Sequence, residues 1–183
     1  MESVDSYVNE MHEVLELLPR TEIARAVEIL SQARYQGSRV FIFGNGGSAA
    51  TALHFACDLA KGTIEEGKPR FKVWALTSNQ SLFSALANDW GYACIFAEQL
   101  ESLAEPGDVA IAISGSGNSE NVLKAIDVAG EKGLTTIGIV GFDGGQLAAK
   151  GDLTILIPCD CMERIEDAHL IVAHAISTSL RKC

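Results

Sequence analysis

Short apolar runs alternate with amphipathic segments from about residue 39 to the end of the chain. The runs close on glycine or polar residues, which is typical of buried strands, and predict strands at residues 40–43, 73–76, 109–113, 135–140 and 153–157. Helical spacing predicts helices at residues 48–61, 80–88, 92–103, 120–130, 146–150 and 162–180. This alternation predicts an α/β fold: a doubly wound, five-stranded parallel sheet of the Rossmann-like kind with right-handed crossovers.

Two amphipathic helices are expected before the first strand. The spacing of apolar residues predicts one helix over residues 3–17, which Pro19 ends, and a second over residues 21–33, with Thr21 as its N-cap and Gly37 at its end. We interpret residues 1–183 as a single domain with residues 1–36 as its N-terminal helical extension. An apolar helical pair of this kind is a candidate contact with another subunit.

Composition and charge exclude several classes of partner. The formal net charge is −10, from 14 Lys and Arg against 24 Asp and Glu, which disfavours nucleic acid and anionic membranes. No apolar run approaches the ~20 residues of a membrane span, and the acidic N-terminus does not resemble a signal peptide. The five cysteines form no C-x-x-C pair, so we expect reduced thiols in a cytoplasmic protein, with Cys159 and Cys161 as strand-end thiols or, alternatively, metal ligands.

A glycine-rich turn follows the first predicted strand and leads directly into a helix. It contains Asn45, Gly46, Gly47 and Ser48. Glycine lets a ligand approach the backbone, and the start of a helix offers free N–H groups to an anion. The turn lacks the spacing of a dinucleotide fingerprint and the Gly-Lys-Ser/Thr of a P-loop. An ordinary tight turn between a strand and a helix is the alternative interpretation.

A second polar turn follows the third predicted strand and also precedes a helix. It contains Ser114, Gly115, Ser116 and Ser119. Serine hydroxyls and backbone N–H groups can surround a phosphate without any cation. Ligands of doubly wound sheets bind at the carboxyl ends of the strands, so both turns should face one crevice. The two turns together predict a pocket for a small phosphorylated ligand.

Histidine and carboxylate pairs occur at helical spacing. His54 and Asp58 lie one turn apart on one face, which suits a metal ion, proton transfer or a structural hydrogen bond. His174 lies in an apolar stretch and is expected to be largely buried. Glu166 lies ~12 Å from it along the helix, so a shared metal would need full stretch or a second subunit. The pair Asn88 and Asp89 is either a C-cap turn or part of a pocket rim.

These residues resemble the sugar isomerase (SIS) domain family over nearly the whole chain, and within it the phosphoheptose isomerases. The similarity is carried by the turn at residues 44–48 with His54-Phe55-Ala56, by the pair at residues 88–89, by residues 107–109, by the turn at residues 114–119, by residues 141–145 and by the last helix. The resemblance implies an SIS-type fold and an aldose–ketose isomerase that acts on sedoheptulose 7-phosphate or a related heptose phosphate.

The resemblance also implies roles for single residues. The resemblance assigns phosphate binding to Ser114, Gly115, Ser116 and Ser119. It assigns contacts with the sugar to Asn45, Gly46, Gly47, Ser48, Asn88, Asp89 and Glu166. A divalent metal, commonly zinc, falls on His54, Asp58, Glu166 and His174, with Asp58 and His174 as the acid–base pair. Members are homotetramers with active sites at subunit contacts, which agrees with the expectation for the N-terminal helices.

The chain departs from the family pattern at three positions. Asp58 stands where glutamate is common, Glu166 where glutamine is common and Gly115 where threonine is usual. These changes fit a subgroup with another sugar phosphate, or retained binding with altered chemistry. An Asp58 that binds metal tightly is not a free base, and the sequence leaves both roles open.

Two rival functions remain as alternatives to the isomerase. A non-catalytic SIS module would sense a sugar phosphate or bind a protein, as relatives that bind a replication initiator do. Retention of His54, Asp58 and His174 argues against that reading. A plain dinucleotide-binding domain is disfavoured because no acidic residue closes the second predicted strand, which ends in Leu76-Thr77-Ser78.

Overall fold

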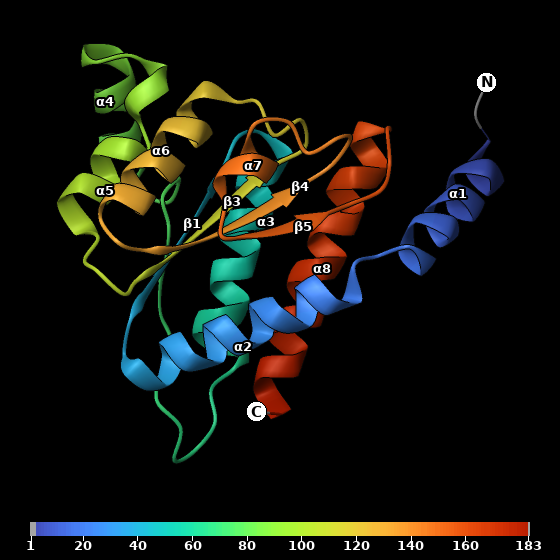
Figure 1. The fold of residues 1–183 in the computed structure, drawn as a ribbon, viewed down its shortest axis with the longest axis horizontal. Coiled ribbons are helices and arrows are strands. Elements are labelled where there is room, and N and C mark those ends of the chain that lie inside the picture. The colour runs from blue at the N-terminus through green and yellow to red at the C-terminus, as the bar shows by residue number, and fades with distance from the viewer. Residues whose placement is uncertain (1–2, 183) are drawn as a thin grey trace.

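The structure, a computed structural model, describes residues 3–182, so Met1, Glu2 and Cys183 lie outside it. Five strands form one parallel sheet in the order β2-β1-β3-β4-β5 (Figure 1). The strands are β1 (Arg39–Gly44), β2 (Lys72–Ala75), β3 (Val109–Ser114), β4 (Thr135–Val140) and β5 (Leu153–Leu156). The predicted doubly wound parallel sheet is confirmed. Because β1 and β3 are neighbours, the two predicted turns leave the sheet side by side.

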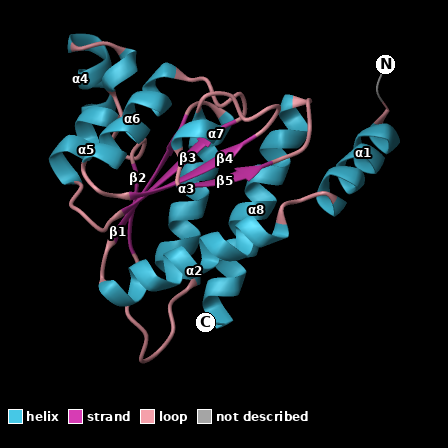
Figure 2. Cartoon of the chain, in the orientation of Figure 1, coloured by secondary structure: helices cyan, strands magenta, loops and turns pink. Residues whose placement is uncertain are grey.

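Helices cover both faces of the sheet (Figure 2). One face packs against α2 (Arg20–Gln36), α3 (Gly47–Cys57) and α8 (Met162–Lys182). The other packs against α5 (Ala97–Leu103), α6 (Glu120–Glu131) and α7 (Leu147–Lys150), with α4 (Gln80–Asp89) at its edge. Residues of β3 alternate between the two cores, with Ile111 and Ile113 in the first and Ala110 and Ala112 in the second. This two-sided burial is why the central strands β1, β3 and β4 are largely apolar, whereas the edge strand β2 keeps Lys72 and Trp74 exposed.

The two helices before the sheet are present, with one corrected boundary. In α1 (Val4–Glu16) the Ser3 hydroxyl caps the first turn by accepting from the Ser6 N–H at 3.0 Å. The prediction of Thr21 as the N-cap of α2 was wrong, because the helix already starts at Arg20. Its hydrogen-bond ladder begins at the Pro19 carbonyl, which accepts from Ile23 N–H at 3.0 Å. Within residues 3–182, no helix has both the length and the apolar composition needed to cross a membrane.

Two predicted helices are interrupted. The segment at 48–61 is α-helical only to Cys57 and continues as a π-helical turn, η1 (Asp58–Gly62). The segment at 92–103 divides into a 3₁₀ turn, η2 (Tyr92–Cys94), and α5. Ile95, Phe96 and Ala97 are buried in succession, and a straight helix with a single apolar face cannot bury three consecutive residues in that way.

The first turns of α8 lie directly on three turns that follow the strands. At a glycine in each turn, the place where a side chain would begin is already filled by a side chain of α8. The pairs, with the distance from an ideal Cβ to the nearest atom, are Gly47 with Glu166 (2.3 Å), Gly115 with Met162 (2.5 Å) and Gly141 with Ile165 (2.5 Å). Glycine at these positions therefore permits the close approach of α8 to the carboxyl edge of the sheet.

His169 is a fully buried titratable group on α8. Neither ring nitrogen has a hydrogen-bond partner among the described residues. Burial therefore lowers the pKa of His169 to about 4, from 6.5. The Val140 carbonyl opposes this shift, because it favours the protonated ring, but it makes no hydrogen bond of ordinary geometry with it. A neutral His169 is thus part of the packed core.

The pKa shift of His169 predicts a loss of stability in mild acid. Its folded pKa lies below the unfolded value, so the unfolded chain takes up the proton first. The stability contributed by the neutral His169 is present above pH 6.5, and it is lost as the pH falls toward 4. Urea unfolding should give a free energy about 2 kcal/mol lower near pH 5 than near pH 7 from this group. The variant His169→Leu should lack that part of the pH dependence, whereas His12→Gln, at an exposed site, should keep it.

Candidate active site

A cavity of about 240 Å³ lies at the carboxyl ends of β1 and β3, under the first turns of α8. It is lined by Asn45, Gly46, Gly47, Ser48, Ile113, Ser114, Gly115, Ser116, Ser119, Met162 and Glu166. The two turns singled out in the sequence therefore form one pocket. Met162 was not predicted, since nothing in the sequence indicates which residue of α8 faces Gly115.

The serine turn presents hydrogen-bond donors to this cavity. The Ser114 hydroxyl accepts from the Gly117 N–H at 3.1 Å, and the Ser116 hydroxyl accepts from the Asn118 N–H at 3.3 Å. Each hydroxyl keeps its own proton for a ligand. Within the described residues, the N–H groups of Ser116 and Ser119 take part in no recorded hydrogen bond. The turn thus offers both hydroxyl and backbone donors at the start of α6.

A reciprocal amide pair joins the first turn to α6, the helix that follows the serine turn. Asn45 Nδ2 donates to Asn121 Oδ1 at 2.9 Å, and Asn121 Nδ2 donates to Asn45 Oδ1 at 2.8 Å. The Tyr92 hydroxyl also donates to Asn45 Oδ1, at 3.0 Å. Asn45 therefore has one N–H left for a ligand, and its main role here is to fix the first turn against α6 and η2. Asn121 and Tyr92 were missed because they lie on other elements, far from Asn45 in sequence.

His54, Asp58 and His174 come together on the neighbouring helices α3 and α8. His54 Nε2 lies 3.2 Å from His174 Nε2, and Asp58 Oδ2 lies 3.4 Å from His174 Nε2 and 3.8 Å from His54 Nε2. The expectation that His174 is largely buried was wrong, because 47 % of its side chain is exposed. Val172, Ala173 and Ile176 face the core, whereas the ring of His174 faces His54 on α3.

This cluster has the donor chemistry of a divalent metal site. Two imidazoles and one carboxylate, with ligand atoms all within 4.8 Å of one another, form the one such group among the described residues. Ligand atoms at about 2.0–2.1 Å from a tetrahedral Zn²⁺ lie roughly 3.3 Å apart, close to the distances here. The three residues fit a zinc ion that keeps an open coordination position. Cys159 and Cys161 belong to no such group.

Glu166 lies in the pocket and is not part of the cluster. Its carboxylate lies against Gly47, the first residue of α3. The start of a helix carries partial positive charge, which stabilises a carboxylate there. His174 lies two turns further along α8, so one subunit does not bring Glu166 to the three other predicted ligands.

Asn88 and Asp89 lie at the exposed end of α4 and do not line the cavity. Asn88 Nδ2 donates to Asp89 Oδ1 at 2.7 Å, and Trp90 follows as the C-cap residue. The chain therefore places this pair at the surface near Tyr92. Their predicted contact with the sugar stays a prediction.

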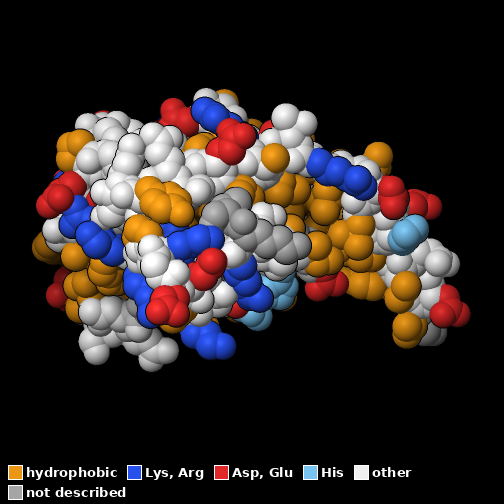
Figure 3. All heavy atoms as spheres, turned by 90° about the horizontal axis from the view of Figure 1, so that it is seen from below, with side chains coloured by type: hydrophobic (Ala, Val, Ile, Leu, Met, Phe, Trp, Pro, Cys, Tyr) orange, Lys and Arg blue, Asp and Glu red, His pale blue; other side chains and the backbone are white. Residues whose placement is uncertain are grey.

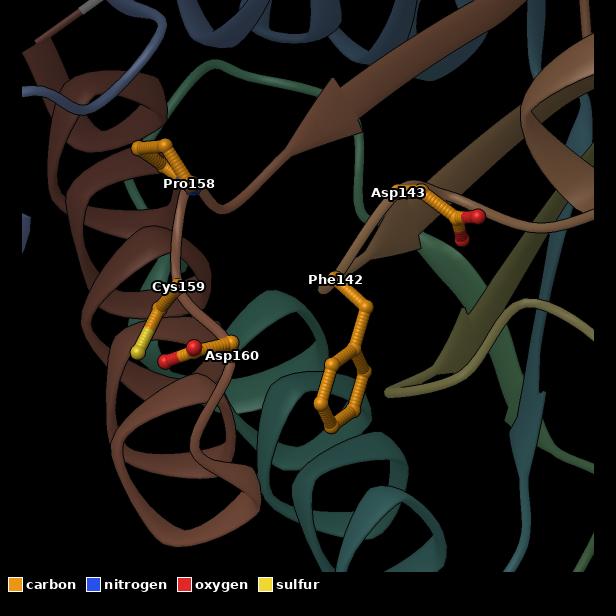
Figure 4. A pocket seen from close by; sticks show the side chains of 5 residues that line it. All are labelled: Phe142, Asp143, Pro158, Cys159 and Asp160. Carbon is orange, nitrogen blue, oxygen red and sulfur yellow. The ribbon is translucent and has the colours of Figure 1, made fainter.

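A wider hollow of about 560 Å³ lies at the ends of β4 and β5, and of the residues considered as ligands in the sequence only Cys159 lines it. Figure 4 shows Phe142 and Asp143 on the loop after β4, opposite Pro158, Cys159 and Asp160 on the segment before α8. Phe142 has φ of 49°, a left-handed conformation that is unusual for an aromatic residue. Its N–H donates to the Cys159 carbonyl at 3.0 Å, which holds the two segments together.

Comparisons with known proteins agree on one family. A family model described as the SIS domain matches residues 6–141. The chain belongs to the SIS domain family, in the group of the phosphoheptose isomerases. It is 38 % identical to the phosphoheptose isomerase of Geotalea daltonii over 185 residues, which covers 100 % of this chain and 96 % of the relative.

Solved structures of SIS proteins extend this similarity to the fold. A phosphoheptose isomerase from Francisella tularensis aligns with a TM-score of 0.91 and 28 % identity, over 98 % of this chain and 97 % of that one. The one from Neisseria gonorrhoeae aligns with a TM-score of 0.90 and 30 % identity, over the same shares. Both leading helices and α8 therefore fall within the shared structure.

The amide pair gives a test of how the first turn is held against α6. Replacing Asn121, which is buried, by Ala leaves the Asn45 amide without its reciprocal partner. We expect the free energy of unfolding to fall by about 1–3 kcal/mol, measured by urea denaturation. Tyr92→Phe removes one exposed hydroxyl and should cost less than about 1 kcal/mol. Equal effects of the two changes would show that the pair does not fix the turn.

Proposed function

We propose that the chain interconverts sedoheptulose 7-phosphate and an aldose heptose 7-phosphate, with the phosphate in the serine turn and the reacting carbons at the His54–Asp58–His174 cluster. The relatives named phosphoheptose isomerase support this reaction, and so does the position of the cavity relative to the cluster. The observation that carries the proposal is their placement along one helix: the pocket lies at the first turn of α3 and the cluster near its end.

The spacing of the two sites suits a seven-carbon substrate. Gly47 lines the same cavity as the serine turn, and His54 lies seven residues beyond Gly47 in α3, about 10 Å along the axis. A seven-carbon chain with a terminal phosphate, at ~1.5 Å per bond, spans roughly the same length when extended. With its phosphate in the serine turn, such a substrate would place C1 and C2 at the cluster.

The cluster contains the groups that the proton transfers need. In the ketose, Asp58 removes a proton from C1 and returns it to C2 through an enediol. His174 moves the proton between the C1 and C2 oxygens with the ring nitrogen that does not ligate a metal, so that the carbonyl passes from C2 to C1. Asp58 Oδ2 is the oxygen that faces both histidines, and Oδ1 is then available for the proton on carbon.

Zinc or a similar divalent ion belongs to this proposal. His54, Asp58 and His174 would hold it, and when bound it would polarise the substrate carbonyl. Through Oδ2, Asp58 would serve as a ligand, while Oδ1 keeps its basic function. Glu166, against Gly47, would contact sugar hydroxyls, as a carboxylate accepts their hydrogen bonds.

Deuterium exchange tests the reaction. Wild-type protein supplied with zinc and sedoheptulose 7-phosphate in D₂O should place solvent deuterium on the isomerising carbons, as read by NMR. Asp58→Asn should lower the exchange rate by about 10²-fold or more, because the base is lost. Asp58→Glu restores a carboxylate and should keep more activity than Asp58→Asn. Binding without any exchange in the wild type would favour the non-catalytic module instead.

We also propose a homotetramer in which α1 is part of an interface. In Figure 1, α1 projects from the body, and hydrophobic side chains lie along it in Figure 3. Val4, Val8 and Leu17 are exposed. The Tyr7 hydroxyl donates to Asp167 on α8 at 2.6 Å, which raises the pKa of Tyr7 to about 12 and fixes the direction of the arm. A projecting amphipathic helix with exposed apolar residues suits burial against another copy.

A single charge on α1 tests this assembly. Val8→Glu should shift the protein from tetramer to smaller species in sedimentation equilibrium, because burying an unpaired carboxylate is costly. Asn9→Glu adds the same charge at the adjacent exposed position of α1, away from the apolar face, and should leave the tetramer intact. A wild-type protein that sediments as a monomer would contradict the proposal.

A further inference from the structure

Met162 is the exposed apolar side chain in the lining of the cavity. The other lining side chains are hydroxyls, an amide and a carboxylate, apart from Ile113, which is fully buried. Met162 keeps 41 % of its surface exposed. An apolar surface next to serine hydroxyls forms no hydrogen bond with a ligand. A polar group of the ligand buried against that surface would lose its hydrogen bonds to water, so an apolar part of the ligand fits there better.

The thioether of Met162 fills the space that a side chain at residue 115 would take. A Cβ built on Gly115 would lie 2.5 Å from Met162 Sδ and 3.1 Å from its Cε. Gly115 stands between Ser114 and Ser116, so the thioether touches the backbone of the serine turn itself. The phosphate end of the cavity therefore has a polar side, formed by the turn, and an apolar side, formed by Met162.

One turn further along α8, Glu166 lies in the same relation to Gly47. Met162 and Glu166 are four residues apart and so lie on one face of the helix. This face presents an apolar group to the serine turn and an acceptor group to the other turn. The two ends of a bound molecule thus meet different surfaces of α8.

We propose that Met162 is a specificity-determining residue that selects primary phosphate esters, in which the phosphate is attached to a CH₂ group. The inference rests on the proposed function in that the ligand is a sugar phosphate. In a primary ester, the carbon next to the phosphate has no hydroxyl and no branch, so a methylene can lie against the thioether. In a secondary or anomeric ester, that carbon has a second substituent, which would collide with Met162 or bury a hydroxyl against it.

Two isomeric probes separate the ester types. Glycerol 3-phosphate is a primary ester and glycerol 2-phosphate is a secondary ester of the same composition and charge. Binding of each ester to the full chain is measured by ³¹P NMR titration. We expect the dissociation constant of the primary ester to be roughly tenfold lower, which is the range for one misplaced small group in a shaped pocket. Inorganic phosphate serves as the reference for the serine turn alone.

Shortening the side chain at residue 162 should change this ratio, and inorganic phosphate should still bind to the serine turn. Met162→Ala should reduce the preference for the primary ester to less than about threefold, while Met162→Leu, which conserves volume and polarity, should keep it. The double variant Gly115→Ala/Met162→Ala refills part of the same space from the turn and should recover part of the preference. Ile171→Ala shortens another exposed apolar side chain of α8, outside the cavity, and is the matched control.

The proposal is overturned if the wild type binds both esters equally, or if Met162→Ala keeps the wild-type preference while its circular dichroism and thermal unfolding match those of Ile171→Ala. The binding readout involves no turnover. A protein that prefers the primary ester but exchanges no deuterium into sedoheptulose 7-phosphate would refute the isomerase and leave the role of Met162 supported.

Discussion

The close approach of α8 to the carboxyl edge of the sheet is the constraint on which the site depends. Gly47, Gly115 and Gly141 each follow a different strand, and each has a side chain of α8 where its own would begin. At Gly141 the neighbour is the fully buried Ile165, and a packed interior leaves no room there for an extra methyl group, whereas the Glu166 and Met162 side chains at the other two glycines are flexible at their ends. This position of α8 determines which of its residues line the cavity, where Glu166 lies and how His174 meets His54.

The same arrangement puts two kinds of chemistry at a fixed separation. Helices α3 and α8 both start at the strand ends and run side by side, so their first turns line the cavity and their later turns bring the histidines together. Asp58 stands where α3 gives way to the π-helical turn η1. Such turns are rare, occur often at functional sites and change which residues face a neighbour. The packed pair of helices thereby fixes the separation between the cavity and the His54–Asp58–His174 cluster.

Much of this was predictable from the sequence, for a physical reason. Buried parallel strands must be apolar on both faces, so their positions and the turns that follow them, at Asn45–Ser48 and Ser114–Ser119, are visible as patterns. The π-helical turn has no spacing signature of its own. The prediction that His174 is buried was wrong because the burial of a helical residue depends on the face of the helix on which it lies, and not on whether its neighbours in sequence are apolar. Tyr92, Asn121 and Met162 belong to the site because of tertiary contacts between elements that are distant in sequence. A local sequence pattern does not predict such contacts.

The absence of any Lys or Arg from the cavity lining has a kinetic consequence. A chain with net charge −10 repels an approaching phosphate at long range, and hydroxyls and N–H groups attract it only at contact. Dissolved salt screens the long-range repulsion and leaves the short-range bonds nearly unchanged. Capture of the substrate should therefore become faster as ionic strength rises, the reverse of what is usual for anion-binding proteins that rely on basic residues.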